Sequence, residues 1–485
     1  MLPLLRHMMR EEWRMHSILL GNRSFSFFPI IMAILAFTAS MLLPIYRLLL
    51  TSEQMAAVMH LIYLFFGLSV GGFGFMGQEA LNRRLGDISL IAYASRTLPV
   101  SERGIFANFV LKDTIFYAFF LILPFFAAYA PSRLMLGLTL ASVPYLAASL
   151  ALTFLFGLSL SFAATTAYAH LGKALLAAVF AGTFAYSLHD PAWLSLEGLS
   201  SLLPPLQFYL HHSPQDAFIA LALAFTLSAS SIWALKVDYR LSARRYHNQY
   251  VSLVGKLGFG RLSPFVAKDL LDLNRSEGGI GKIFMSFGLP IVAVVAMVSF
   301  FSRLLPIETY HFMMLISLMT GLVSTSLYSW LTELDFEELY AFMPIHTSYI
   351  MASKLALYGA VSVAVGTPII AASYSLLAPA LVFLPAGLLL AASVAAYSVA
   401  VTAYLTGLKP NVMLYSGGVF ALYVLAILPP LILPAVLFMT GYASQMLSLS
   451  LTALYAIVLL PASIVILRRS LVKWDAAEGI TPGAV

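Results

Sequence analysis

The feature that most limits the fold of this chain is a series of apolar stretches, each about as long as a bilayer is thick. A helix that crosses the hydrocarbon needs about 20 consecutive, mostly apolar residues. Stretches of this kind lie at about 27–47, 55–77, 105–128, 142–168, 172–188, 217–236, 284–302, 310–331, 350–373, 380–406, 413–436 and 446–467. Only 10% of the residues are charged, whereas a soluble domain has about 25%. The sequence therefore predicts an all-α polytopic membrane protein, embedded in the lipid bilayer by about 12 transmembrane helices.

In two regions the sequence does not show where one span ends and the next begins. Residues 134–168 form an apolar region that is too long for one simple helix. Residues 413–467 contain Pro429, Pro430 and Pro434. Prolines are tolerated inside membrane helices because neighbouring groups satisfy the freed carbonyls, so these prolines do not fix the limits of a span.

The distribution of positive charge predicts the orientation of the chain. The predicted spans divide the loops into two alternating sets. Of the 27 Lys and Arg residues, all but Arg47, Arg133 and Arg303 fall in one set. Loops on the cytoplasmic side of a membrane carry the excess of Lys and Arg. We therefore expect a multi-pass protein of the cell membrane with both termini in the cytoplasm.

The spacing of prolines indicates that the chain contains two related halves. Pro3 and Pro29 are 26 residues apart, and so are Pro264 and Pro290. Each pair encloses a polar segment with apolar residues at helical spacing, a pattern typical of a helix that lies along a membrane face. The alternative is that prolines near span ends and basic segments beside them are ordinary features of membrane proteins.

A duplication of this kind predicts three regions. The first six-span half would comprise residues 1–240, a cytoplasmic linker residues 241–263, and the second six-span half residues 264–485. Arg14 and Arg275 stand at the same position in the two polar segments. Because six spans return the chain to the side where it started, the halves would be parallel repeats about an axis along the membrane normal.

A short polar element with a central proline follows the second span of each half. The first copy reads TLPVSERGIFA at residues 97–107, and the second reads FMPIHTSYIMASK at residues 342–354. A proline with small polar neighbours ends one helix and starts the next. We therefore expect a short helix along the cytoplasmic face that continues rigidly into the third span. The alternative is an ordinary solvated loop followed by a helix start.

The order of these features resembles the permease subunits of ABC exporters of the ABC-2 type. In that family an interfacial "elbow" helix precedes the first span, and a segment that couples to an ATPase lies between the second and third spans. The coupling segment typically reads Leu-Pro-Val/Ile-Ser, basic or polar residues, Ile, small residues and Lys, and an acidic residue commonly precedes it. The matching positions of this chain are Leu98, Pro99, Val100, Ser101, Arg103 and Ile105 in the first copy, Pro344, Ile345, Ile350 and Lys354 in the second, and Glu79 and Glu333 before them.

The chain departs from the family pattern in both copies. The first copy has Phe109 where the family lysine falls, and Lys112 follows three residues later. The second copy has His346 and Thr347 where a serine and a basic residue are usual. The two ATPase-coupling surfaces are therefore expected to be unequal.

The resemblance implies a permease subunit of an ATP-driven exporter, with its two halves forming a pseudo-dimer within one chain. Its expected partners are separate ABC ATPase subunits, two in number, which would bind ATP and Mg, so that this chain binds no cofactor itself. Glu338 belongs to an acidic run after Glu333 and would add to the docking surface. Arg14 and Arg275 would mark the two elbow helices.

Other known chemistry finds little support in the sequence. The string SEGGIGKI at 276–283 has a serine and an isoleucine at two positions that a phosphate loop needs as Gly and Ser/Thr. The chain has no cysteine, and its ten histidines show no metal-ligand spacing. The string GFGFMG at 72–77 lies within a predicted span and, with Gly67 and Gly71, predicts a small-residue face for close helix packing. We expect no enzyme active site, no metal site and no nucleic-acid partner.

Two alternatives to an exporter subunit remain from the sequence. A twelve-span secondary carrier would bury carboxylates at depth to bind its coupling ion, and the predicted spans carry almost no charge near their centres. Lys112 and Asp113 lie in the cytoplasmic third of the third span, where their opposite charges can pair with one another. A membrane protein that transports nothing, either an enzyme or an assembly scaffold, is the other alternative.

Overall fold

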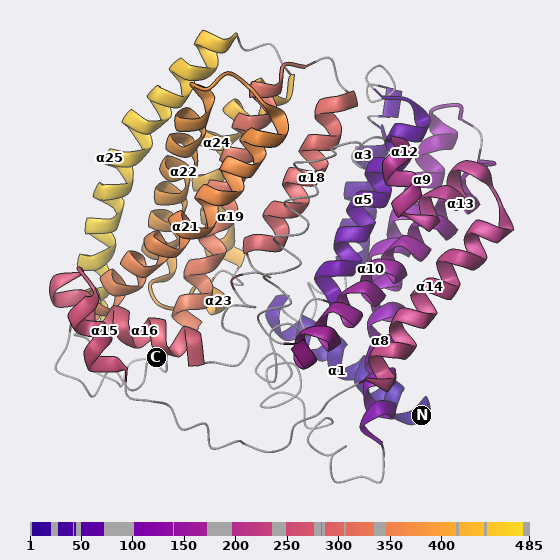
Figure 1. Ribbon diagram of the computed structural model, residues 1–485, viewed down its shortest axis with the longest axis horizontal. Helices are drawn as coiled ribbons and strands as arrows, with labels where there is room; N and C mark the ends of the chain where they lie inside the picture. Colours follow the sequence, from indigo (N-terminus) through magenta and orange to yellow (C-terminus); the bar gives the residue numbers. More distant parts are fainter. Residues whose placement is uncertain are drawn as a thin grey trace. The chain divides into compact units, whose positions relative to one another are not determined.

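The computed structural model describes most of the chain as two compact units. The described residues are 2–20, 28–41, 43–44, 50–71, 101–138, 140–171, 196–234, 249–275, 283, 287–304, 307–333, 346–413, 417–440 and 444–478. Unit 1 comprises residues 1–241 with 303–305, and unit 2 comprises residues 242–302 and 306–485. In Figure 1, unit 1 runs from indigo to magenta and unit 2 runs from pink to yellow.

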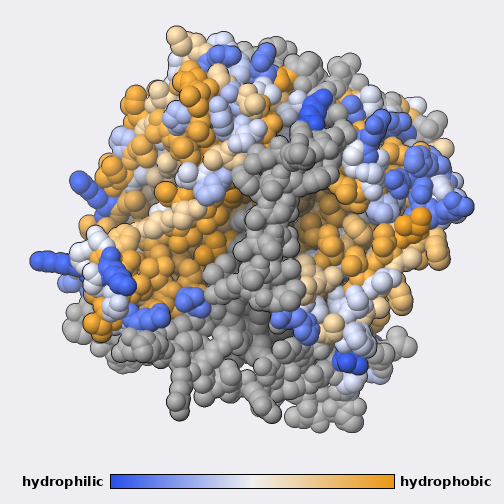
Figure 2. Space-filling model, viewed as in Figure 1, coloured by the Kyte–Doolittle hydropathy of each residue, from blue (hydrophilic) through white to orange (hydrophobic). Residues whose placement is uncertain are grey.

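The described part of the chain is helical and apolar. Every regular element in it is a helix. Nine of its helices are long and apolar enough to cross a membrane, and shorter apolar helices end at Met41 and Arg303. Figure 2 shows a hydrophobic zone in each unit between more hydrophilic ends. The predicted all-α character is therefore confirmed for the described residues, and their long apolar helices are those of a membrane-embedded protein. The predicted span at 172–188 lies outside the described residues.

Unit 1 begins with a polar helix and continues with apolar ones. Its third predicted span is one continuous helical segment whose middle is a π-helical turn, η2. Residues 134–135 complete this segment, and the next helix begins at Val143, so the structure divides the long apolar region 134–168. The elements are α1 (Leu2–Leu20), α3 (Phe28–Met41), α5 (Ser52–Gly71), α8 (Glu102–Tyr117), η2 (Ala118–Ile122), α9 (Leu123–Met135), α10 (Val143–Leu171), α12 (Leu196–Leu202), α13 (Pro204–His211) and α14 (Pro214–Trp233).

Unit 2 repeats this order of a polar helix followed by apolar ones. The three prolines that obscured its last spans all lie inside α24, and Pro461 lies inside α25. The elements are α15 (Tyr250–Lys256), η4 (Gly260–Leu262), α16 (Ser263–Arg275), α18 (Leu289–Leu304), α19 (Thr309–Glu333), α21 (Thr347–Leu377), α22 (Phe383–Thr406), α23 (Pro410–Met413), α24 (Gly417–Thr440) and α25 (Gln445–Glu478).

Three helix pairings recur in the two units. In unit 1, α5 packs on α10, α10 packs on α14, and the polar helix α1 packs on α8. In unit 2, α19 packs on α22, α22 packs on α25, and the polar helix α16 packs on α21. In the numbering of the predicted spans, these are the same pairs: second with fourth, fourth with sixth, and polar helix with third.

Glycines let the second and fourth predicted spans cross closely in both units. Gly67 of α5 and Gly157 of α10 face one another, and a Cβ placed at Gly157 would lie 2.5 Å from the carbonyl oxygen of Leu64. In unit 2, a Cβ at Gly321 of α19 would lie 2.6 Å from the carbonyl oxygen of Ala391. Small residues of this kind allow the backbones of membrane helices to approach. The predicted packing role of Gly67 is therefore confirmed, while residues 72–77 lie outside the described residues.

Candidate functional site

The start of α8 carries the described part of the first proline element. Ser101 has extended backbone angles, and its hydroxyl oxygen accepts a hydrogen bond from the Gly104 N–H at 3.2 Å. Serine at this N-cap position satisfies one of the free N–H groups at a helix start. Ser101 and Arg103 are exposed, and Ile105 is half-buried. Arg103 is therefore accessible at the surface of unit 1.

The start of α21 carries the described part of the second proline element and is capped differently. His346 stands at the N-cap position, but its side chain makes no capping hydrogen bond. Instead, the Ser348 N–H donates to the carboxylate of Asp475 on α25, at 2.8 Å. A carboxylate at a helix N-terminus also stabilises the helix dipole. The second element is thus tied to the last helix of the chain, a contact that the sequence analysis missed.

Removing this cap should loosen the start of α21. The change Asp475→Ala deletes the acceptor for the Ser348 N–H, and losing a capping side chain typically costs about 1 kcal/mol. Amide hydrogen exchange in peptides covering residues 347–352 should therefore speed up, as measured by mass spectrometry on the purified full chain. Asp272→Ala is the matched control, because Asp272 forms a partly exposed ion pair with Lys268 on α16. Equal exchange in both variants would contradict the assigned cap.

The end of α25 that carries Asp475 is anchored to two further helices. The Trp474 indole N–H donates to the Ala403 carbonyl at 3.0 Å, and its ring covers Gly407, where a Cβ would lie 2.7 Å from the ring. Gly407 has a φ of 58°, a conformation that glycine adopts without strain. The Tyr328 hydroxyl donates to the Gly407 carbonyl at 2.7 Å. The ends of α19, α22 and α25 therefore meet at the start of α21.

A buried ion pair joins α21 to the polar helix α16. The Lys354 ammonium lies 2.7 Å from Asp269 Oδ1 and donates to the Leu331 carbonyl at 2.9 Å. The side chains of Lys354 and Asp269 are 0% and 2% exposed. The family resemblance implies that Lys354 and Ile350 belong to an ATPase-coupling surface, but both side chains are buried in unit 2. Lys354 therefore links α21 to α16 and to the end of α19 inside unit 2.

A second buried ion pair joins α8 to the polar helix α1. The Lys112 ammonium contacts the carboxylate of Glu12 and lies 3.0 Å from Asp113 Oδ1. All three side chains are less than 5% exposed. The predicted pairing of Lys112 with Asp113 is confirmed, but the contact with Glu12 was missed. Both units therefore contain the same kind of ion pair. In each, a lysine of the helix that follows the proline element binds an acidic side chain of the polar helix.

The acidic partners are displaced by one helical turn between the two polar helices. Counted from the proline that is the second residue of each helix, Glu12 lies nine residues on and Asp269 lies five residues on. The position of Glu12 is taken by Leu273 in α16, and the position of Asp269 is taken by Met8 in α1. All four side chains are buried. An α-helical turn has 3.6 residues, so the two positions lie about one turn apart on the same face of each helix. In α1 the apolar side chain comes first and the acid second, whereas in α16 the acid comes first.

The lysines are displaced in the same way. Counted from the proline of each element, Lys112 lies 13 residues on and Lys354 lies ten residues on. Leu357 stands at the position of Lys112 in α21, and Phe109 stands at the position of Lys354 in α8. The Lys112 ammonium lies 5.1 Å from the centre of the Phe109 ring. The shift in the lysine thus compensates the shift in the acid, and an ion pair forms in both units.

Several predicted site residues belong to neither of the two buried ion pairs nor to the described helix starts. Arg14 is exposed on α1. Arg275 and Glu333 are the last residues of α16 and α19, and their side chains lie outside the described part. The following predicted residues lie outside the described residues altogether: Glu79, Leu98, Pro99, Val100, Glu338, Pro344 and Ile345.

The described residues contain no group of three or more His, Asp or Glu side chains that could hold a metal ion. In comparisons of the whole chain, no family model, no curated protein and no solved structure matches it.

Proposed function

We propose that the chain is the membrane-spanning permease subunit of an ATP-driven exporter of the ABC-2 type. It would lie in the cell membrane with both termini in the cytoplasm, as 12 spans in two parallel halves, with α1 and α16 as elbow helices. The observation that carries the proposal is the buried ion pair that links a polar helix to the helix after the proline element, once in each unit. A partner that pushes on the proline element would therefore move the third span and the polar helix together.

The surface of α1 supports its position at the inner membrane face. Arg6, Arg10 and Arg14 recur every four residues and are exposed, whereas Met8 and Glu12 are buried. Residues four apart share a helix face, so the arginines form one basic stripe beside a buried face. Basic residues next to a span are attracted to the anionic lipids of the cytoplasmic leaflet. The stripe fits a helix that rests on this leaflet.

In the proposed mechanism, the two ion-paired helix pairs, α1 with α8 and α16 with α21, act as levers. Two separate ATPase subunits, which bind ATP and Mg, would close on ATP and press on the proline elements. The Lys112–Glu12 and Lys354–Asp269 pairs would carry this movement to α1 and α16. The first three spans of each half would then rock and open the substrate path toward the outside.

The buried acidic side chains in the described part of the chain support a secondary carrier less than they support an exporter subunit. A carrier coupled to protons or sodium needs a carboxylate that titrates or binds an ion along the path. Glu12, Asp113 and Asp269 are instead ion-paired with lysines. Each of them lies on or against α8 or α21, the helices that follow the proline elements, where a structural role for the charges is sufficient.

Co-purification with the ATPase encoded beside the gene tests the proposal. Wild type carrying a C-terminal tag should bring down the ATPase in a fixed ratio. The double variants Pro99→Ala/Arg103→Glu and Pro344→Ala/Glu338→Lys should each weaken this binding, because they alter the predicted docking elements. Arg303→Glu is the matched control, since Arg303 is exposed and belongs to the few positive charges predicted on the outer side.

The same preparation distinguishes the exporter from the carrier. If wild type binds no ATPase and the purified chain alone moves solutes in liposomes, the proposal is wrong and the secondary carrier is the better account. If Arg303→Glu weakens the complex as much as the two double variants do, the proline elements are not the docking sites.

A further inference from the structure

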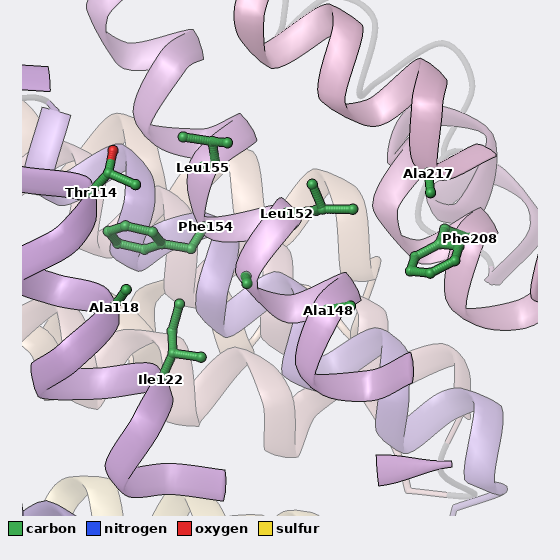
Figure 3. A pocket seen from close by; sticks show the side chains of 10 residues that line it. Thr114, Ala118, Ile122, Ala148, Leu152, Phe154, Leu155, Phe208 and Ala217 are labelled. Atoms are coloured by element: carbon green, nitrogen blue, oxygen red, sulfur yellow. The ribbon is translucent and has the colours of Figure 1, made fainter. Parts of the chain in front are cut away.

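An apolar groove lies along one face of α10 in unit 1 and has a volume of about 410 Å³. Figure 3 shows its walls: Thr114, Ala118 and Ile122 come from the α8–η2 segment on one side, and Phe208 and Ala217 come from α13 and α14 on the other. The floor is formed by side chains of α10. All of these elements belong to unit 1, so the groove is complete within one unit.

The groove exists because short side chains stand where long ones would fill it. On α10, Ala148, Ala151 and Leu152 share a face because they are three and four residues apart. Ala118 and Ala217 stand on the two facing walls. Ala118 also begins the π-helical turn η2. Such turns are inserted single turns that often occur at functional sites.

Water is a poor occupant for this groove. A water molecule held inside a protein needs two to four polar partners and takes up roughly 30 Å³ in the liquid. Among the described residues that line the groove, Thr114 alone has a polar side chain, and its hydroxyl already donates to the Val110 carbonyl at 2.8 Å. A volume of about 410 Å³ with this lining therefore requires an apolar occupant.

The rims of the groove indicate where that occupant comes from. On α8 and η2, the large apolar side chains Ile115 and Phe119 are exposed, and on α14 the same is true of Phe218, Leu221 and Phe225. Both segments are long and apolar enough to cross a membrane. Side chains exposed on such helices face lipid tails, so the groove opens toward the hydrocarbon of the bilayer.

One end of the groove adjoins polar side chains. Phe208 lies one helical turn before His211, and Ala217 directly follows Asp216. His211 Nδ1 and Asp216 Oδ2 are 3.3 Å apart, and His211 is exposed. Ionisable side chains are costly inside the hydrocarbon, so this pair is expected where the helices reach the headgroup level.

We propose that this groove binds one acyl chain of a bilayer phospholipid, with the headgroup beside His211 and Asp216. The proposal requires a membrane-embedded unit 1 and does not depend on the exporter function. A lipid held there would fill the space between the α8–η2 wall and α14 and would stabilise their separation.

Photo-crosslinking tests the proposal on the full chain. The purified protein is reconstituted in phosphatidylcholine nanodiscs that contain a small fraction of phosphatidylcholine with a diazirine on one acyl chain. After illumination, mass spectrometry locates the lipid adducts. We expect adducts within residues 148–155 and at residue 217. Ala148→Leu and Ala217→Leu should reduce them by roughly fourfold for each methylene group displaced from the groove.

Ala127→Leu on α9 is the matched control, because Ala127 is exposed but does not line the groove. This variant should leave the adducts unchanged. An absence of adducts on residues 148–155 in the wild type would overturn the proposal. An equal loss of adducts in all three variants would also overturn it, because the loss would then not result from filling the groove. Since the two filling changes lie at exposed and half-buried positions, we expect all variants to elute as wild type does in size-exclusion chromatography.

Discussion

Replacing Lys354 by Met should lower the free energy of unfolding of the protein by about 3 kcal/mol, the lower end of the range for breaking a buried ion pair. The change leaves the buried carboxylate of Asp269 without its closest counter-charge. The lower end applies because the Lys268 ammonium remains 3.6 Å from the same Asp269 oxygen. Unfolding in mixed micelles with increasing SDS, followed by tryptophan fluorescence, measures the difference from wild type.

A second variant separates the charge from the packing at this site. In Lys354→Met/Asp269→Leu both charges are gone, and replacing a buried pair by apolar groups of similar volume is often neutral or stabilising. We therefore expect the double variant to recover most of the loss. Lys268→Met, which removes a partly exposed charge on the same helix, should change stability by less than about 1 kcal/mol. If the single and double variants were equally unstable, the ion pair would not be the cause.

The double variant also tests the proposed coupling role. It should fold and should bind the ATPase, because Arg103 and the first proline element are untouched. If it folds but no longer links ATP hydrolysis to export, the pair transmits movement. If export is normal, the pair serves folding alone, and the lever mechanism is wrong for unit 2.

Gly321→Ala should destabilise the protein by about 1–3 kcal/mol, the usual effect of overpacking a tight contact. The added Cβ would lie 2.6 Å from the Ala391 carbonyl oxygen, so α19 and α22 would have to move apart. Gly359→Ala is the matched control within the same unit, because no atom lies within 4 Å of a Cβ there. The SDS unfolding experiment compares the two. Equal stability of both variants would show that α19 and α22 do not cross as closely as described.

The positions of several apolar helices could be predicted because hydropathy depends on neighbouring residues alone. The stretch 310–331 corresponds to α19 (Thr309–Glu333), and the stretch 380–406 corresponds to α22 (Phe383–Thr406). The third span of each half begins three residues earlier than predicted, at 102 and 347. Its first turn is polar and is set by capping, which an apolar window does not detect.

The contacts of the candidate site could not be predicted in the same way. Glu12 and Lys112 are 100 residues apart, Asp269 and Lys354 are 85 apart, and Ser348 and Asp475 are 127 apart. Local pattern carries no information on such pairs. A signal was nevertheless present: Lys354 stands in an otherwise apolar segment, and a lysine there requires an acidic partner. The family motif favoured a surface role for Lys354 instead.

The one-turn displacement between the two ion pairs bears on how a chain with two similar halves avoids assembling incorrectly. If α1 docked on α21 instead of α8, Glu12 would face Leu357, and Lys354 would face Met8. Two unpaired ions would then be buried, at an effective penalty of several kcal/mol for each. This penalty would disfavour the docking of α1 on α21 while the chain folds. The two units share three helix pairings, but an exchange of their polar helices would leave buried charges unpaired. Each polar helix would therefore fit only its own unit.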